Sequence, residues 1–250
     1  MYQIKGAITV KKLISLTIVT VMLLASLCSC NGKTPSDNDG NTALEIYTDI
    51  LTLYENMIMH KHSGNKVSEF DMSRYEDVSD DIKKALIFVL ENNHPQTLGY
   101  ALKDINSDSH PELILLNYSY DILALFTTVN AKPILVDTFG MGNVVGAIDQ
   151  NGTIYKESYS KGETWSQHVM TLTASGELEG LRYGCIDYNG YFDEPQKVEY
   201  YLYISDDRYK ITKQNLGVLS DKYSSIFSDT ANTTKNSGLK LEYVIEFDPK

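Results

Sequence analysis

Two stretches near the start of the chain repeat apolar residues at helical spacing. From 43 to 60, apolar side chains return every three or four residues, which predicts a helix with one buried face. Thr42 and Glu45 stand three residues apart ahead of this pattern, as in a capping box. A second helix is expected to begin near Ser79 and to end before Asn92. The polar segment between the two helices is interpreted as a loop.

After Pro95 the pattern changes to short runs rich in tyrosine, threonine, valine and isoleucine. Glycine-containing turn signals separate the runs, which is typical of strands joined by tight hairpins. Strands are therefore expected at 98–104, 112–119, 122–129, 133–138, 144–149, 153–159, 166–173, 177–183, 197–204 and 208–211.

The last part of the chain predicts one more helix and one more strand. Apolar residues at helical spacing indicate a helix at 213–227, and strict alternation indicates a half-buried strand at 239–247. Two-residue turns join antiparallel strands, whereas parallel pairs need long crossovers. The sequence thus predicts an α+β fold in which N-terminal helices are followed by an antiparallel meander sheet, a late helix and a C-terminal strand. Residues 43–250 are expected to form a single domain.

The first 29 residues have the pattern of a signal peptide. Lys11 and Lys12 precede a largely apolar run at 13–27, and an apolar core behind basic residues is typical of secretory signals. The run is shorter than the about 20 residues that a transmembrane helix needs. Residues 1–29 are therefore expected to be absent from the mature protein.

Leu27, Cys28, Ser29 and Cys30 follow the apolar run and resemble the lipobox of bacterial lipoproteins. The resemblance implies that the Cys30 sulfur carries a diacylglycerol, and that the mature, extracytoplasmic chain begins there and is anchored to the cell membrane. Cys28 fits less well, because Leu27 would then occupy the position of a small residue. The alternative is an ordinary cleaved signal, or an uncleaved anchor, with incidental cysteines.

Residues 30–42 combine the lipidated cysteine with a polar segment. No residue from 31 to 42 is apolar, so this segment has nothing to bury. A dozen such residues form a flexible tether with a reach of roughly 20 Å. The folded part is thus expected to stand clear of the lipid head groups.

The composition is that of a packed globular chain, with 42% hydrophobic and 10% aromatic residues. Asp and Glu number 33 against 22 Lys and Arg, and loss of Lys5, Lys11 and Lys12 with the signal leaves 19 basic residues and a net charge of −14. Nucleic acid and anionic membrane surfaces are disfavoured, because binding them requires clustered basic residues. A cation such as calcium suits this charge, and a monomer is expected.

One segment places oxygen-bearing residues at alternate positions between two expected strands. Side-chain oxygens at relative positions one, three and five, a backbone carbonyl at seven and a carboxylate at nine can converge on one hard cation. Calcium, which takes six or more oxygen ligands, fits such a set. The candidate ligands are Asp104, Asn106, Asp108, His110 and Glu112.

The segment D-x-N-x-D-x-x-P-E-L, within 98–116, resembles the calcium loops of dockerin-like and FG-GAP repeat domains. It is more similar to a D-x-D-x-D-G-x-P-E-L hairpin in lipoproteins of Gram-positive bacteria. The resemblance implies that the four acidic and amide side chains bind calcium together with the His110 carbonyl. Ser109 stands where that pattern has glycine, at a bend whose left-handed geometry costs other residues roughly 1 kcal/mol. The alternative is a metal-free hairpin of Asx turns.

Other residues offer weaker signals. His60 and His62 do not share a helix face, and Cys185, the cysteine that remains after processing and lipidation, is interpreted as a small buried residue. Tyrosines crowd the segment 183–209, where they either stack on a ligand or divide between the core and the sheet surface.

Two functions stay open. The first is a non-enzymatic surface lipoprotein that binds a protein or glycan partner and is steadied by calcium. The second is a membrane-anchored hydrolase acting on glycan or peptide. The first is preferred because the chain contains no G-x-S-x-G or H-E-x-x-H motif. A Ser/His pair or a pocket of convergent carboxylates would favour the second.

Overall fold

The computed structural model describes residues 44–140, 144–160, 164–188, 197–204 and 207–244. All of them belong to the compact unit Asp39–Lys250. The predicted signal peptide, Cys30 and the tether lie outside the described residues. Within the described part of the chain, no helix is both long and apolar enough to cross a membrane.

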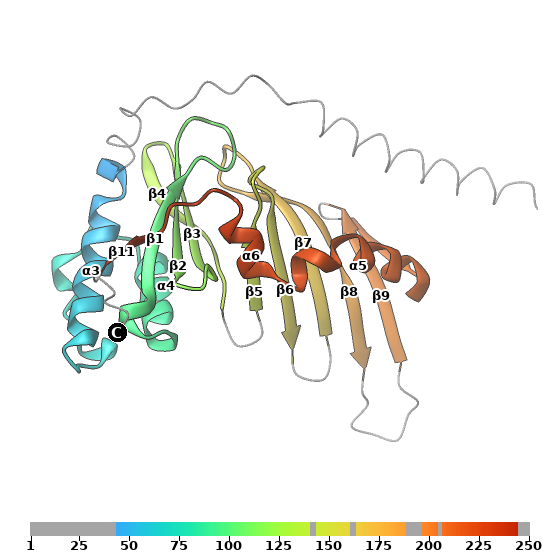
Figure 1. Cartoon of the computed structure of the whole chain (residues 1–250), viewed down its shortest axis with the longest axis horizontal. Helices are drawn as coiled ribbons and strands as arrows, with labels where there is room; N and C mark the ends of the chain where they lie inside the picture. The colour runs from blue at the N-terminus through green and yellow to red at the C-terminus, as the bar shows by residue number, and fades with distance from the viewer. Residues whose placement is uncertain (1–43, 141–143, 161–163, 189–196, 205–206, 245–250) are drawn as a thin grey trace, which may run out of the picture. The chain divides into compact units, whose positions relative to one another are not determined.

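Two helices form a layer over the first sheet (Figure 1). Residues 44–46 are helical, but Tyr47 leaves helical geometry with ψ 5°, so the regular helix α3 spans Thr48–His62 and begins later than predicted. Helix α4, Asp80–Asn92, begins as predicted, because the Ser79 hydroxyl accepts a hydrogen bond from the Ile82 amide. The segment predicted as a loop contains two short 3-10 helices, η1 (Val67–Glu69) and η2 (Met72–Arg74), and a third, η3 (Pro95–Thr97), leads into the first strand.

The first sheet is antiparallel with the strand order β11-β1-β2-β3-β4. Strand β2 lies at its centre, and residues 113–116 of this strand are completely buried. Such a continuous apolar run indicates a strand covered on both faces. The strands are β1 (Leu98–Lys103), β2 (Glu112–Asn117), β3 (Ile122–Val129), β4 (Lys132–Thr138) and β11 (Glu242–Tyr243).

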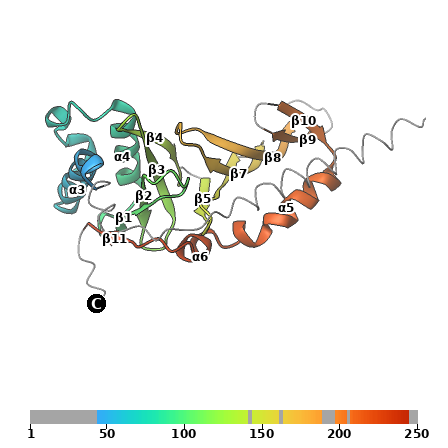
Figure 2. The same cartoon turned by 90° about the horizontal axis from the view of Figure 1, so that it is seen from above.

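The second sheet is also antiparallel, with the order β10-β9-β8-β7-β6-β5. Helix α5 (Lys213–Phe227) lies along one face of this sheet (Figure 2). Tyr183 in β8 anchors α5 by donating a hydrogen bond to the Leu219 carbonyl at 3.3 Å. The strands are β5 (Val144–Ile148), β6 (Ile154–Ser160), β7 (Thr164–Leu172), β8 (Leu178–Tyr188), β9 (Lys197–Ile204) and β10 (Asp207–Ile211).

Three apolar clusters hold these layers together. The first fills the space between α3, α4 and one face of the first sheet. The second joins the other face of that sheet to Ile148, Ile154 and Met170 of the second sheet. The third packs α5 on the second sheet. The first sheet is therefore covered on both faces, while the second sheet has α5 on one face.

The α+β prediction is confirmed, with the meander divided between two sheets rather than continuous in one. The predicted helix at 213–227 coincides with α5. Helix α6 (Thr230–Lys235) was not predicted, because it is short and polar; the Asp229 side chain caps it by accepting a hydrogen bond from the Asn232 amide. The predicted final strand is reduced to β11, since β1 pairs with only two of its residues, and residues 245–247 lie outside the description.

Removing a side chain from the first cluster should be costly. Leu86 in α4 is completely buried, so Leu86→Ala is expected to lower the free energy of unfolding by about 2–5 kcal/mol through lost burial and a cavity. Val218 in α5 is 67% exposed, and Val218→Ala should change it by less than about 0.5 kcal/mol. Urea unfolding of both variants checks this, and equal losses would contradict the core assignment.

Candidate functional site

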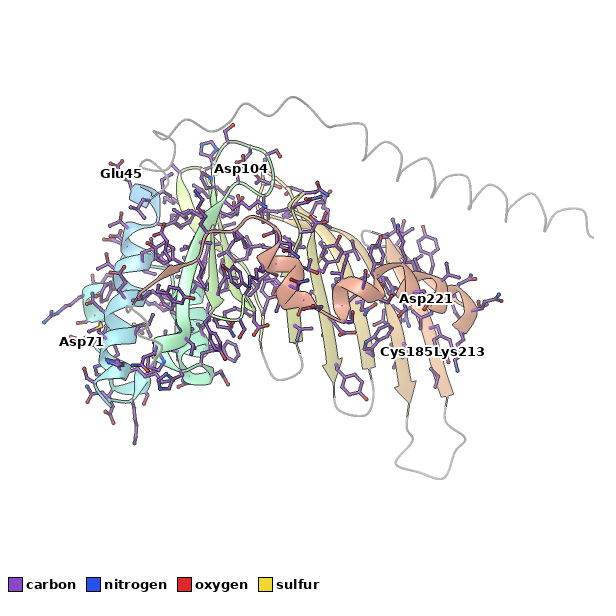
Figure 3. The ribbon with its side chains drawn as sticks, viewed as in Figure 1. Glu45, Asp71, Asp104, Cys185, Lys213 and Asp221 are labelled. Carbon is purple, nitrogen blue, oxygen red and sulfur yellow. The ribbon has the colours of Figure 1, made fainter. Side chains whose placement is uncertain are left out.

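The predicted calcium loop connects β1 to β2, and Figure 3 shows Asp104 at its beginning. The two Asp104 oxygens accept hydrogen bonds from the amides of Ser107 at 2.7 Å and Ser109 at 3.0 Å. The Asn106 Oδ1 accepts one from the Asp108 amide at 3.1 Å. The side chains thus fold inward onto the loop's own backbone, as in successive Asx turns. Ser109 has φ 72°, the left-handed geometry expected at the position where the similar loops carry glycine.

Glu112, the last predicted ligand, is completely buried at the first position of β2. Its Oε2 accepts a hydrogen bond from the Ile105 amide at 2.8 Å, and its Oε1 accepts one from the Thr127 hydroxyl at 2.9 Å. Burial raises the pKa of this carboxyl to about 7, against the effect of the two hydrogen bonds, and the charges of Asp108 and Asp104 raise it further.

The other two predicted carboxylates, Asp104 and Asp108, lie close enough to Glu112 for their charges to act on it. Asn106 joins them by donating from Nδ2 to the Asp108 Oδ2 at 3.0 Å. The His110 ring is largely exposed, with Nδ1 3.5 Å from the Asp108 Oδ1. Among the described residues, no three His, Cys, Asp or Glu side chains form a ready metal site. A calcium ion here would thus depend also on the Asn106 amide and on backbone carbonyls.

The structure also places the tyrosines of segment 183–209, Cys185 and His60. Tyr183 and Tyr201 are buried, whereas Tyr209 is 48% exposed, which matches the expectation of tyrosines shared between core and sheet surface. Cys185 is partly buried and packs at the edge of the α5 cluster, consistent with a structural residue. The His60 Nε2 forms a hydrogen bond with the Lys66 carbonyl at 3.0 Å.

Sequence reasoning missed a Ser–His contact on the second sheet. On the face opposite α5, the hydroxyls of Ser158 and Ser166 are 2.7 Å apart, and the Ser166 hydroxyl is 3.2 Å from the His168 Nε2. Burial lowers the pKa of His168 to about 4, and the charges of Arg182 and Lys156 lower it further. The spacing of Ser166 and His168, two residues apart in one expected strand, was the available signal.

The two side chains of the Ser166–His168 pair differ in how accessible they are to a ligand. A cavity of about 420 Å³ opens beside His168 and Arg182, but Ser166 is only 2% exposed. Comparison of the chain with protein-family models, curated proteins and solved structures found no match.

The buried Glu112 predicts a pH dependence of stability. A folded pKa of about 7, above the ordinary 4.5, gives stability that is complete below pH 4.5 and is lost as the pH rises through 7. Without calcium, the free energy of unfolding should fall by roughly 3 kcal/mol across this interval through Glu112. Glu112→Gln carries no charge and should remove most of that fall.

Chemical unfolding at several pH values in chelator measures this difference. Glu76→Gln, which alters an exposed carboxylate, serves as the matched control and should follow the wild-type profile. A Glu112→Gln profile parallel to the wild type would show that Glu112 does not titrate in this interval.

Proposed function

We propose that the protein is a lipid-anchored extracytoplasmic binding module whose β1–β2 loop is stabilised by calcium. One observation carries the location: the lipobox-like residues Leu27 to Cys30 directly follow a short apolar run with basic residues before it. The diacylglycerol on Cys30 anchors the module to the membrane, and the polar segment 31–42 tethers it.

The charges of the loop support the calcium proposal. Burial raises the pKa of Glu112, and the charges of Asp108 and Asp104 raise it further, so the two aspartates oppose the ionisation of Glu112. A divalent cation among them would remove this repulsion and favour the ionised Glu112. Ser109 has the left-handed backbone geometry that favours glycine, and this strain is expected to weaken binding. The affinity should therefore be that of a weak extracellular site, with a Kd of about 0.1–1 mM.

The second candidate is a membrane-anchored hydrolase acting on glycan or peptide, and the observation in its support is the Ser166–His168 contact. A serine nucleophile needs an accessible hydroxyl and a histidine that becomes positively charged during the reaction. Ser166 is 2% exposed, and burial together with Arg182 and Lys156 opposes the charged form of His168. These features favour the binding role over the hydrolase.

Lipidation is tested by metabolic labelling. Expressed in a bacterial host with labelled palmitate, the wild type should incorporate the label, whereas Cys30→Ala should remain unlabelled and either unprocessed or released. Cys28→Ala is the matched control, because it removes the neighbouring thiol and leaves Cys30 available. Incorporation by Cys30→Ala at the wild-type level would contradict the proposal.

Calcium binding is tested by thermal unfolding of the full chain in a neutral detergent. With free calcium tenfold above its Kd, the expected gain is about 1.4 kcal/mol, or about 3–6 °C in Tm. Asp104→Ala should abolish the gain, because it removes the carboxylate at the first ligand position. Magnesium should have a much smaller effect, since it loses its water ligands reluctantly.

The control for this experiment is Asp221→Ala. Asp221 lies in α5, far along the chain from the loop, so this variant removes one carboxylate and should keep the calcium response. A wild-type Tm that is equal in millimolar calcium and in excess chelator would identify the loop as a plain hairpin.

A further inference from the structure

The chain has three arginines, Arg74, Arg182 and Arg208, and two of them, Arg182 and Arg208, lie on the second sheet on either side of one tyrosine. Arg182 in β8 is opposite Tyr203 in β9. Tyr203 is in turn opposite Arg208 in β10. The register therefore places a tyrosine between two arginines across three adjacent strands.

These side chains lie on the face of the second sheet opposite α5. Tyr183 and Leu202 belong to the cluster that packs on α5. Successive side chains of a strand point to opposite faces, so their neighbours Arg182 and Tyr203 project to the other side. We call this surface, made by Arg182, Tyr201, Tyr203 and Arg208, the arginine face.

The two guanidinium groups are gathered around the same two rings. The Cζ of Arg182 is 5.8 Å from the ring centre of Tyr201 and 5.4 Å from that of Tyr203. The Cζ of Arg208 is 5.6 Å and 6.0 Å from the same ring centres. These cation–π contacts hold both guanidiniums over one small area of the sheet.

The positive charge of this area is only partly neutralised. The Glu199 carboxylate lies 3.7 Å from Arg208 and 3.6 Å from Lys210, so two cations share one carboxylate. For Arg182, the described part of the chain provides no carboxylate within 4.0 Å. Burial lowers the pKa of the adjacent His168, and the charges of Arg182 and Lys156 lower it further. A chain with an acidic total thus carries a local cationic surface.

The Tyr201 hydroxyl is a second and independent sign of a ligand. Tyr201 is 2% exposed, and its hydroxyl has no hydrogen-bond partner among the described residues. It lies over Gly184, 2.9 Å from the position that a Cβ there would occupy, so it lies on the arginine face. A buried hydroxyl without a partner is costly. An oxygen-rich anion would accept its hydrogen bond, and the exposed Arg182 side chain can move to admit one.

We propose that the arginine face binds a phosphate group carried by a soluble ligand, with Arg182 and Arg208 contacting its oxygens and the Tyr201 hydroxyl donating to it. Phosphate suits this set because it offers several oxygens to two planar guanidiniums at once. A membrane surface suits it less, since the mature chain's net charge of −14 repels anionic lipid. The inference rests on the proposed binding role and uses no residue of the calcium loop.

Arginine Nε–H resonances of the full chain in neutral detergent provide the test, because three arginines give three signals that single Arg→Gln variants assign. Titration with inorganic phosphate at constant ionic strength should shift the Arg182 and Arg208 signals saturably and leave the Arg74 signal in place. Tyr201→Phe keeps the ring and should weaken the apparent affinity about tenfold or more, through loss of a hydrogen bond to a charged group.

Two comparisons make the result specific. Arg182→Gln should abolish the saturable shift of Arg208, whereas Arg74→Gln, which removes the same charge elsewhere, should not affect it. Asp104→Ala should retain phosphate binding, which separates this inference from the calcium proposal. Equal, non-saturating shifts of all three signals, an unchanged affinity in Tyr201→Phe, or shifts with phosphatidylglycerol vesicles but not with phosphate would overturn the proposal.

Discussion

The burial of β2 on both faces is the constraint on which the rest of the structure depends. Leu113 and Leu115 belong to the cluster beneath the two N-terminal helices, while Ile114 and Leu116 belong to the cluster shared with the second sheet. A central strand of this kind has no polar face to offer solvent. Both helices and the second sheet are therefore needed to cover it, and its first residue, Glu112, enters the interior with it.

Glu112 connects this core to the loop above it. Its carboxylate receives hydrogen bonds from Ile105 in the loop and from Thr127 in the neighbouring strand, so the charge state of one side chain acts on both. An ionised, desolvated carboxylate close to Asp104 and Asp108 is unfavourable without a cation. A proton on Glu112 removes this buried charge, and under the calcium proposal a bound ion would compensate it instead, which would link the candidate metal site to folding stability.

Local patterns in the sequence were sufficient for most elements. The helix at 213–227 and the strands around 98–129 follow from apolar periodicity and from turns between them. The oxygen-rich loop was visible because its residues are adjacent in sequence. Periodicity does not report which strands share a sheet, so the division into two sheets was not predictable. It also cannot anticipate α6, whose stability depends on contacts such as the Ile148 amide donating to the Thr234 hydroxyl.

The arginine face was hidden from the sequence for the same reason. Arg182 and Arg208 are distant along the chain and meet only through the register of β8, β9 and β10. Likewise, the Tyr201 hydroxyl, which has no hydrogen-bond partner within the described parts of the chain, lies against Gly184 of the neighbouring strand. Candidate sites built from consecutive residues can be predicted from sequence, whereas sites built across strands require the pairing to be known.

The most direct test of the account is the titration of the Glu112 carboxyl itself, followed through its carboxyl carbon resonance in the full chain with and without calcium. Without calcium the account predicts a pKa of about 7, because burial opposes the charge. With calcium it predicts a pKa well below that value, because a bound cation favours the carboxylate. The same pKa under both conditions would contradict the coupling between calcium, loop and core.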